Sequence, residues 1–157
     1  MQESTLPFQL DARLQGDCLL IGQFPLCQIL LLNDKHFPWI ILVPRRPDVT
    51  ELIQLCAEDQ QQLLLESTVI SRLLLDCFPT EKLNTAAIGN IVSQLHIHHV
   101  ARRRDDHCWP GVVWGYGEGQ PYNDTEKKAL TKKIQKALEG ECDFTLLQST
   151  TGAPIKL

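Results

Sequence analysis

Runs of apolar residues predict strands in the first fifty residues of the chain. Cys18–Phe24, Cys27–Asn33 and Trp39–Val43 are each rich in Leu, Ile or Val. Pro25 and Pro44 follow the first and third runs, and proline cannot donate a hydrogen bond to a neighbouring strand. Polar turn residues separate the second run from the third. We therefore expect a meander of two or three antiparallel strands.

Apolar residues at broadly helical spacing predict a long packing helix over residues 58–78, and Pro79 would end it. A second helix is expected over residues 124–139, because Asn123 and Glu126 form the pattern of a capping box. The lysines of the second helix are expected on a solvated face. A role for them in attracting phosphates is the alternative.

A polar and histidine-rich stretch follows a further predicted strand, Leu83–Ile88. Polar and apolar residues alternate from Gln94 to His98, which indicates a half-buried strand. The alternation places Gln94, His96 and His98 on one face of the strand, with same-face neighbours roughly 6.5–7 Å apart. Leu95 and Ile97 then point in the opposite direction, toward a core. His99 falls on the core face, where we expect a hydrogen-bonded packing or interface residue.

Two histidines on one open strand face are difficult to explain by packing, since histidine is not a favoured core residue. Three interpretations remain open: an exposed polar face, a zinc site, or a site of reaction chemistry. A zinc site needs three or four ligands, and His107 and Cys108 would complete one only if their loop folds back.

Composition narrows the class of protein. The chain has 157 residues, a usual length for one domain, and its net charge of −4 gives no general attraction to nucleic acid or an acidic membrane. No apolar run approaches the ~20 residues of a membrane span, and the N-terminus lacks the pattern of a signal peptide. Six cysteines without a Cys-x-x-Cys pair are expected to be reduced, in a cytoplasmic protein.

The histidine stretch resembles the signature of the histidine-triad (HIT) superfamily of nucleotide hydrolases and transferases. That signature is His-φ-His-φ-His-φ-φ, with φ apolar. Gln94 stands at the first histidine position, His96 at the second, His98 at the third, and Arg102 at an arginine that often follows. The resemblance spans about residues 18–115, including a Trp-Pro element at 109–110 found in one branch of the superfamily.

The resemblance implies an α+β fold with an antiparallel sheet of about five strands and one long packing helix. We expect a single HIT-like domain over residues 1–157, in which residues 116–157 form a C-terminal extension that holds the second helix. It also implies a homodimer that binds a nucleotide, with neither cofactor nor metal. The expected substrate is a dinucleoside polyphosphate, such as diadenosine tetraphosphate, or an adenylylated compound.

The resemblance also assigns roles to site residues. His96 would attack an α-phosphorus and form a nucleotidyl-histidine intermediate, while His98 would donate to a phosphate oxygen. The expected nucleotide or phosphate contacts are Asn33, Asn84 and Asn90. Gln94 can keep the hydrogen bonds of a histidine but cannot carry a proton near neutral pH, so we expect it to orient its neighbours. The rival hypothesis is a nucleotide-binding protein in which Gln94 marks weak or lost catalysis.

Two further segments carry expectations. Residues 108–117, called the aromatic arm below, hold two Trp and one Tyr among glycines and do not look like regular structure. We expect them to pack within the molecule, with a subunit interface or a ligand lid as the alternative. Residues 145–157 are expected to be irregular or weakly β.

Overall fold

The structure is a computed structural model that describes residues 7–147. Part of the expected irregular tail, residues 148–157, lies outside the described residues. The elements follow one another as α1 (Ala12–Asp17), β1 (Cys18–Gln23), β2 (Cys27–Leu32), β3 (Trp39–Pro44), a short 3-10 helix (Leu52–Gln54), α2 (Ala57–Cys77), β4 (Lys82–Ala86), β5 (Ile97–Arg102) and α3 (Asp124–Leu138). The predicted strands and both long helices are confirmed, with bounds shifted by a few residues.

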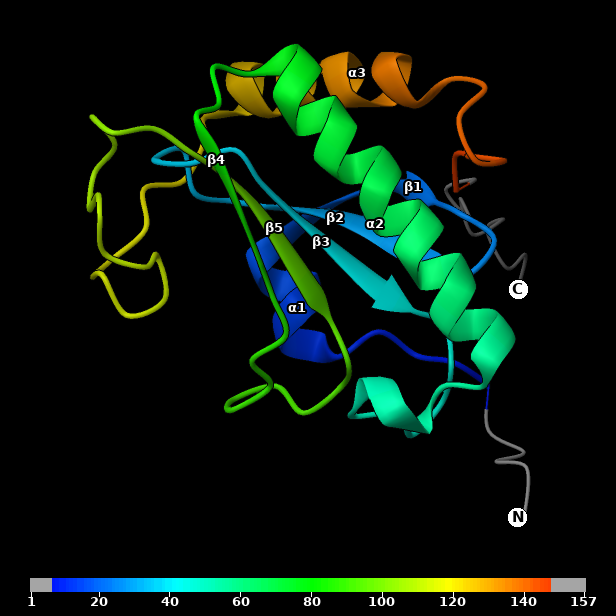
Figure 1. The fold of residues 1–157 in the computed structure, drawn as a ribbon. Coiled ribbons are helices and arrows are strands. Elements are labelled where there is room, and N and C mark those ends of the chain that lie inside the picture. The colour runs from blue at the N-terminus through cyan, green and yellow to red at the C-terminus, as the bar shows by residue number, and fades with distance from the viewer. Residues whose placement is uncertain (1–6, 148–157) are drawn as a thin grey trace, which may run out of the picture.

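The strands form one antiparallel sheet in the order β1-β2-β3-β5-β4. The first three strands are a meander, as the apolar runs predicted. After α2 the chain returns to add β4 at the far edge, and β5 then inserts between β3 and β4 (Figure 1). This confirms the expected α+β fold. The histidine strand β5 is therefore interior to the sheet, where it is paired on both sides.

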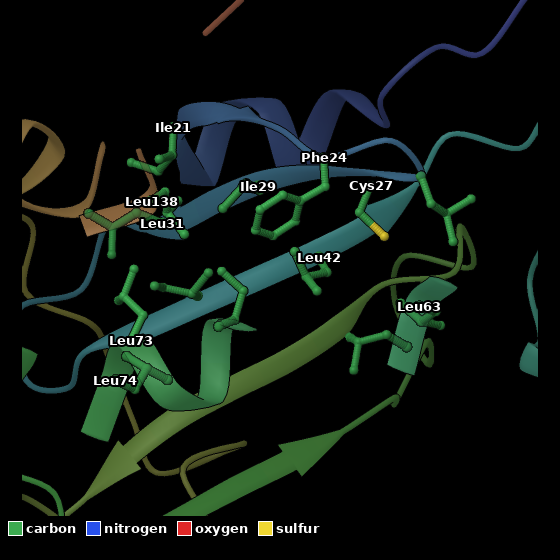
Figure 2. Close-up of a cluster of buried hydrophobic side chains, with 14 of the residues drawn as sticks. Ile21, Phe24, Cys27, Ile29, Leu31, Leu42, Leu63, Leu73, Leu74 and Leu138 are labelled. Atoms are coloured by element: carbon green, nitrogen blue, oxygen red, sulfur yellow. The ribbon is translucent and has the colours of Figure 1, made fainter. Parts of the chain in front are cut away.

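One face of the sheet is covered by α2 and α3. Alternate strand residues point into this layer and meet the apolar stripe of α2, as Figure 2 shows for Leu42, Leu73 and Leu74. Helix α3 adds Ile134 and Leu138, both fully buried. Full burial of each such aliphatic side chain stabilises the fold by about 1.5–3 kcal/mol. This face holds the larger core of the protein.

The opposite face of the sheet packs against α1 and the aromatic arm. The residues that alternate with the first set, including Trp39, Ile41 and Val100, form a second apolar cluster on this side. Leu14 of α1 and Val113 of the arm complete it. Intramolecular packing of the arm, the expected interpretation, therefore accounts for much of its apolar content.

The C-terminal part of the described chain closes the β1 edge of the sheet. Thr145 exchanges backbone hydrogen bonds with Gln23, and the ring of Phe144 lies directly over Gly22. A Cβ at Gly22 would come within 2.5 Å of that ring, so this position requires glycine. Among residues 7–147, no helix is both long and apolar enough to cross a membrane.

Candidate functional site

A cavity of about 720 Å³ opens on the face of the sheet opposite α2 and α3. Its volume lies in the range usual for small-molecule sites. We call it the histidine cavity, because His96 and His98 both line it. The other walls come from α1, the turn after β2, the loop at residues 88–92 and the arm. The two imidazole rings lie 4.8 Å apart between centroids, at 71° to each other.

His96 directly precedes β5, and its ring is held by one main-chain hydrogen bond. Its Nδ1 lies 2.7 Å from the carbonyl oxygen of Gln94. A carbonyl only accepts, so Nδ1 must carry the proton of the neutral ring and Nε2 must hold a lone pair. Nε2 makes no hydrogen bond with the described residues, and it is not among the buried atoms that lack a partner. In the neutral form of the ring, the lone pair of Nε2 is therefore free for a ligand in the cavity that His96 lines.

His98 is held in the opposite tautomer by Trp39. The indole Nε1–H of Trp39 donates to Nδ1 of His98 over 2.9 Å. Since indole is a donor only, Nδ1 must be the acceptor and the neutral ring carries its proton on Nε2. Burial, with smaller contributions from His96 and His99, lowers the pKa of His98 to about 3. At neutral pH the ring is an uncharged donor.

The side chain of Gln94 does not line the histidine cavity. Its Oε1 accepts from the N–H of Asp11 over 2.9 Å, and its Nε2 donates to the carbonyl of Gln9 over 2.8 Å. The expectation that Gln94, His96 and His98 share a strand face is therefore wrong for Gln94. Strand β5 begins only at Ile97, and the amide of Gln94 pairs with the segment before α1 instead.

His99 points to the helix-covered face, as expected, and is fully buried. Its Nε2 lies 2.6 Å from the hydroxyl of Ser67 on α2. Its Nδ1 is buried and makes no hydrogen bond with the described residues. Burial lowers the pKa of His99 to about 4. It is a packing residue of the core, separated from the cavity by the sheet.

The three asparagines proposed from the resemblance lie in different places. Asn33 and Asn90 line the histidine cavity, and Asn33 also accepts from the N–H of Tyr122. Asn84 does not line it. Asn84 lies on β4, where its Oδ1 accepts from Nη1 of Arg102 over 2.7 Å. Residues 89–92 also line the cavity, and within residues 7–147 their N–H groups make no hydrogen bond.

The side chain of Arg102 on β5 links this strand to β4 and to the aromatic arm. It is 1 % exposed, and its guanidinium donates to both carboxylate oxygens of Asp106 and to the carbonyl of Gly111. The same group lies 5.5 Å from the ring of Trp109. Its charge is thus used inside the fold, and Arg102 does not line the cavity.

Asp34 attaches the far end of the arm to the turn after β2. Its carboxylate accepts from the hydroxyl of Tyr116 and from the N–H groups of His36 and Gln120. Burial raises the pKa of Asp34, but these hydrogen bonds outweigh it and leave the pKa below its usual value. The ionised carboxylate therefore fixes the arm as a wall of the cavity.

The structure does not assemble the ligands that a zinc site would need. Within residues 7–147, no group of three or more His, Cys, Asp or Glu side chains is placed to hold a metal ion. His107 stacks on His36, with ring centroids 4.2 Å apart, instead of joining His96 and His98. All six cysteines are free thiols, as expected.

Sequence reasoning missed Trp39, Asp34 and Arg13 as residues of the cavity. The apolar run predicts a strand at Trp39 but no site, although Trp39 shares the cavity-side face of β3 with Ile41. Ile41 pairs directly with His98, so Trp39 is the diagonal neighbour of His98, within reach of a long aromatic side chain. The alternation along β3 indicates which residues share a face with Trp39. Only the register between β3 and β5 shows that this face meets His98.

Comparison with known proteins places the chain in a family. The HIT domain profile matches residues 13–105. A histidine triad protein from Marinobacter aquaeolei VT8 is similar, with 43% identity and a TM-score of 0.83, covering 85% of this chain and 97% of that one. One from Sinorhizobium meliloti 1021 has 43% identity and a TM-score of 0.81, covering 83% and 97%. A third, from Bradyrhizobium japonicum, has 39% identity and a TM-score of 0.81, covering 84% and 98%.

No curated protein sequence matches the chain significantly. The profile match covers more than half of the chain, and the three solved structures agree with it in fold and at 39–43% identity. The predicted resemblance is confirmed: this chain belongs to the HIT domain family.

Proposed function

We propose that this protein is a nucleotide phosphohydrolase or nucleotidyl transferase that works through a covalent nucleotidyl-His96 intermediate. The observation that carries the proposal is the pair of opposite tautomers. His96 offers a lone pair on Nε2 and His98 offers a proton on Nε2, and both residues line one cavity. A nitrogen with a free lone pair beside an N–H donor suits attack on a phosphate.

In the first step, Nε2 of His96 attacks the α-phosphorus and the bond to the leaving group breaks. The ring becomes positively charged, and its Nδ1–H still donates to the carbonyl of Gln94, which stabilises that charge. Nε2–H of His98 and the free N–H groups of residues 89–92 are the proposed donors to the phosphate oxygens. Removing one such donor typically raises the barrier by about 2.7–4 kcal/mol.

The nucleoside part would lie against the apolar wall of the cavity. Leu14, Ile41 and Val113 supply an apolar surface there, with Asn33 and Asn90 as candidate polar contacts. The substrate is a dinucleoside polyphosphate or an adenylylated compound. In this description the role of Gln94 is to orient: its backbone accepts from His96, and its amide holds the segment before α1.

A specific observation favours a second candidate, a nucleotide-binding protein with weak turnover. The side chain of Gln94 is bonded to residues 9 and 11, so the first position of the signature supplies no proton carrier beside His96. If proton transfer to the leaving group limits the reaction, this protein would bind nucleotide and turn it over slowly.

Incubating the pure protein with diadenosine tetraphosphate and with an adenylylated compound separates the two candidates. Release of mononucleotide that disappears in a His96→Ala variant supports the enzyme. Tight nucleotide binding without release from either compound contradicts it and favours the binding protein.

We also propose that the protein forms a homodimer. Among the described residues, strand β4 pairs only with β5, which leaves its other edge open. Helix α2 exposes Leu64 and Leu75, at 68% and 52%. Sedimentation of the protein and of a Leu64→Glu variant tests the dimer, because a monomeric wild type would contradict it.

We further propose that the protein is cytoplasmic, because its free thiols suit a reducing compartment.

A further inference from the structure

Resting on the proposed function, we propose that the site selects nucleotides by their leaving group. It acts on anhydrides whose leaving group departs as an anion, in preference to phosphoramidates or phosphate esters of weakly acidic alcohols, whose leaving groups need a proton. Trp39 is the positioning residue that sets this preference, because it fixes His98 as a donor that cannot give its proton away.

His98 is the side chain best placed to protonate a leaving group. It lines the cavity beside His96, and its Nε2–H makes no hydrogen bond with the described residues and is not among the buried atoms that lack a partner. To give that proton at neutral pH it would first need a second proton on Nδ1. The indole N–H of Trp39 occupies Nδ1, and a hydrogen bond to the neutral form disfavours the charged form. Without that second proton, loss of Nε2–H would leave an imidazolate. His98 therefore stabilises charge without transferring a proton.

The other acidic groups around the histidine cavity do not replace it. Gln94 is turned away, and the proton of the Tyr116 hydroxyl is donated to Asp34. Burial raises the pKa of Tyr116 above its usual value and that of Cys18 to about 12, so both are weaker acids than usual. A leaving group in this cavity would depart without help from a side-chain acid.

The charges of the lining point to a short anhydride. Among the cavity residues within 7–147, Arg13 is the only cation, while Asp17 and Asp34 are carboxylates. A long polyphosphate would place several charges against a lining that does not neutralise them. Of the two substrate classes proposed above, an adenylylated compound therefore fits better than a long dinucleoside polyphosphate. Examples are a mixed anhydride of a nucleotide with a carboxylic acid or with one further phosphate.

The bonds balance without a general acid. The Nε2–P bond forms as the P–O bond to the leaving group breaks, and the leaving oxygen keeps the electron pair. A water oxygen then attacks phosphorus, the N–P electron pair returns to Nε2 of His96, and the proton of that water passes to solvent. The net reaction adds one water and releases the nucleotide, the leaving anion and one proton.

The tautomer is tested first, without any substrate. Nitrogen-15 NMR of histidine-labelled protein should show His98 protonated on Nε2 only, and His96 on Nδ1. Trp39→Phe should give His98 a mixture of both tautomers. Trp114→Phe is the matched control: Trp114 also contacts the His98 ring, with centroids 5.5 Å apart, but its buried N–H has no partner among the described residues. A wild-type His98 protonated on Nδ1 would overturn the proposal.

The leaving group is tested with aryl esters of adenosine 5′-phosphate, from acidic nitrophenols to weakly acidic alkylphenols. We use kcat/KM because it reports the first chemical step. It should fall about tenfold for each unit of phenol pKa, as expected when the leaving oxygen takes the full charge. Adenosine phosphoramidate should be a poorer substrate than acetyl adenylate. In Trp39→Phe the fall in kcat/KM across the series should be about fivefold smaller, because Nδ1 of His98 is then free to accept a proton while Nε2–H gives one to the leaving group.

The outcomes separate this inference from the proposed function. Turnover that is nearly independent of the leaving group, or faster for the phosphoramidate, overturns the leaving-group inference and leaves the enzyme standing. No turnover of any compound overturns both. A flattened dependence in Trp39→Phe but not in Trp114→Phe supports Trp39 as the residue that sets the preference.

Discussion

The two faces of β5 bury histidines under opposite conditions. On the helix-covered side, His99 pairs with Ser67, and its second ring nitrogen is sealed in the core. On the cavity side, His96 and His98 each use Nδ1 for one internal hydrogen bond and leave Nε2 toward open space. Both faces are apolar and well packed. The two sides differ in the place of the ring nitrogen that makes no internal hydrogen bond. Only on the cavity side is that nitrogen available to a ligand.

Glu66 shows the same contrast in a carboxylate. It is fully buried on the helix side, where its two oxygens accept from the N–H groups of Leu26 and Cys27 and from the amide of Gln62. Glu66 is therefore a structural group, because both of its buried oxygens accept hydrogen bonds from within the fold. Burial alone therefore does not distinguish a candidate site residue from a structural one. His96 and His98 differ from Glu66 because each lines the cavity and keeps one ring nitrogen without a hydrogen bond to the described residues.

The largest expected effect is on the cavity side. His96→Ala removes the proposed nucleophile, so nucleotide turnover should fall by at least about 10⁴-fold, as for a residue that forms the covalent intermediate. The loss is measured as kcat/KM with an acetyl adenylate substrate. Folding is checked by urea unfolding, and undiminished turnover would remove His96 from the mechanism.

The helix side should be sensitive to acid. The pKa of His99 is about 4 in the folded protein because of burial, against its ordinary value of 6.5. Below pH 6.5 the unfolded chain therefore binds a proton that the folded protein rejects, and stability is lost as pH falls toward 4. At pH 4.5 this loss is about 2.5 kcal/mol from His99.

A His99→Leu variant tests this contribution. Urea unfolding at pH 7 and pH 4.5 should show a smaller decrease for the variant than for the wild type, by about 2.5 kcal/mol. Burial also lowers the pKa of His98 and adds a loss of the same sign to both proteins. Equal decreases in the two proteins would show that His99 is not held neutral by the fold.

Glu66→Gln should destabilise the fold by about 2 kcal/mol, because the new amide group would face a backbone N–H that now donates to the carboxylate. The matched control is Glu118→Gln, an exposed position where we expect a change within about 0.5 kcal/mol. Both are measured as free energies of unfolding at pH 7. Similar values for the two variants would contradict a structural role for Glu66.

The smallest effect is expected for Gln94→Leu. The variant loses two hydrogen bonds to the partly exposed segment before α1, where water replaces them, so we expect a loss of about 1 kcal/mol. Amide exchange at Asp11 should become faster. Gln9→Ala is the control, because only the backbone carbonyl of Gln9 takes part. Unchanged amide exchange at Asp11 in Gln94→Leu would show that the side chain of Gln94 does not hold the segment before α1.

The sequence predicted elements better than it predicted partners. Apolar runs such as Cys27–Asn33 located the strands because a strand buried on both faces is apolar along its whole length. Alternation placed His96 and His98 together, which the cavity confirms. It failed at Gln94, because the ladder begins at Ile97 and alternation does not show where pairing starts.

Contacts between strands were the part that sequence could not supply. The bond from Trp39 to His98 depends on the register of β3 against β5, two strands separated in the chain by α2 and β4. Asn84 lies near His96 in sequence, but on β4 it is committed to Arg102. Both outcomes depend on long-range pairing, which no local pattern determines.

The covalent nucleotidyl-His96 intermediate can be tested directly by trapping it. The protein is mixed with a nucleotide substrate labelled at the α-phosphorus, quenched within the first turnover in base, where a phosphorus–nitrogen bond survives best, and digested with trypsin. Label is expected on the peptide of residues 83–102, located at His96 by fragmentation and absent from His96→Ala. Turnover with no labelled peptide, or label at another residue, would contradict it.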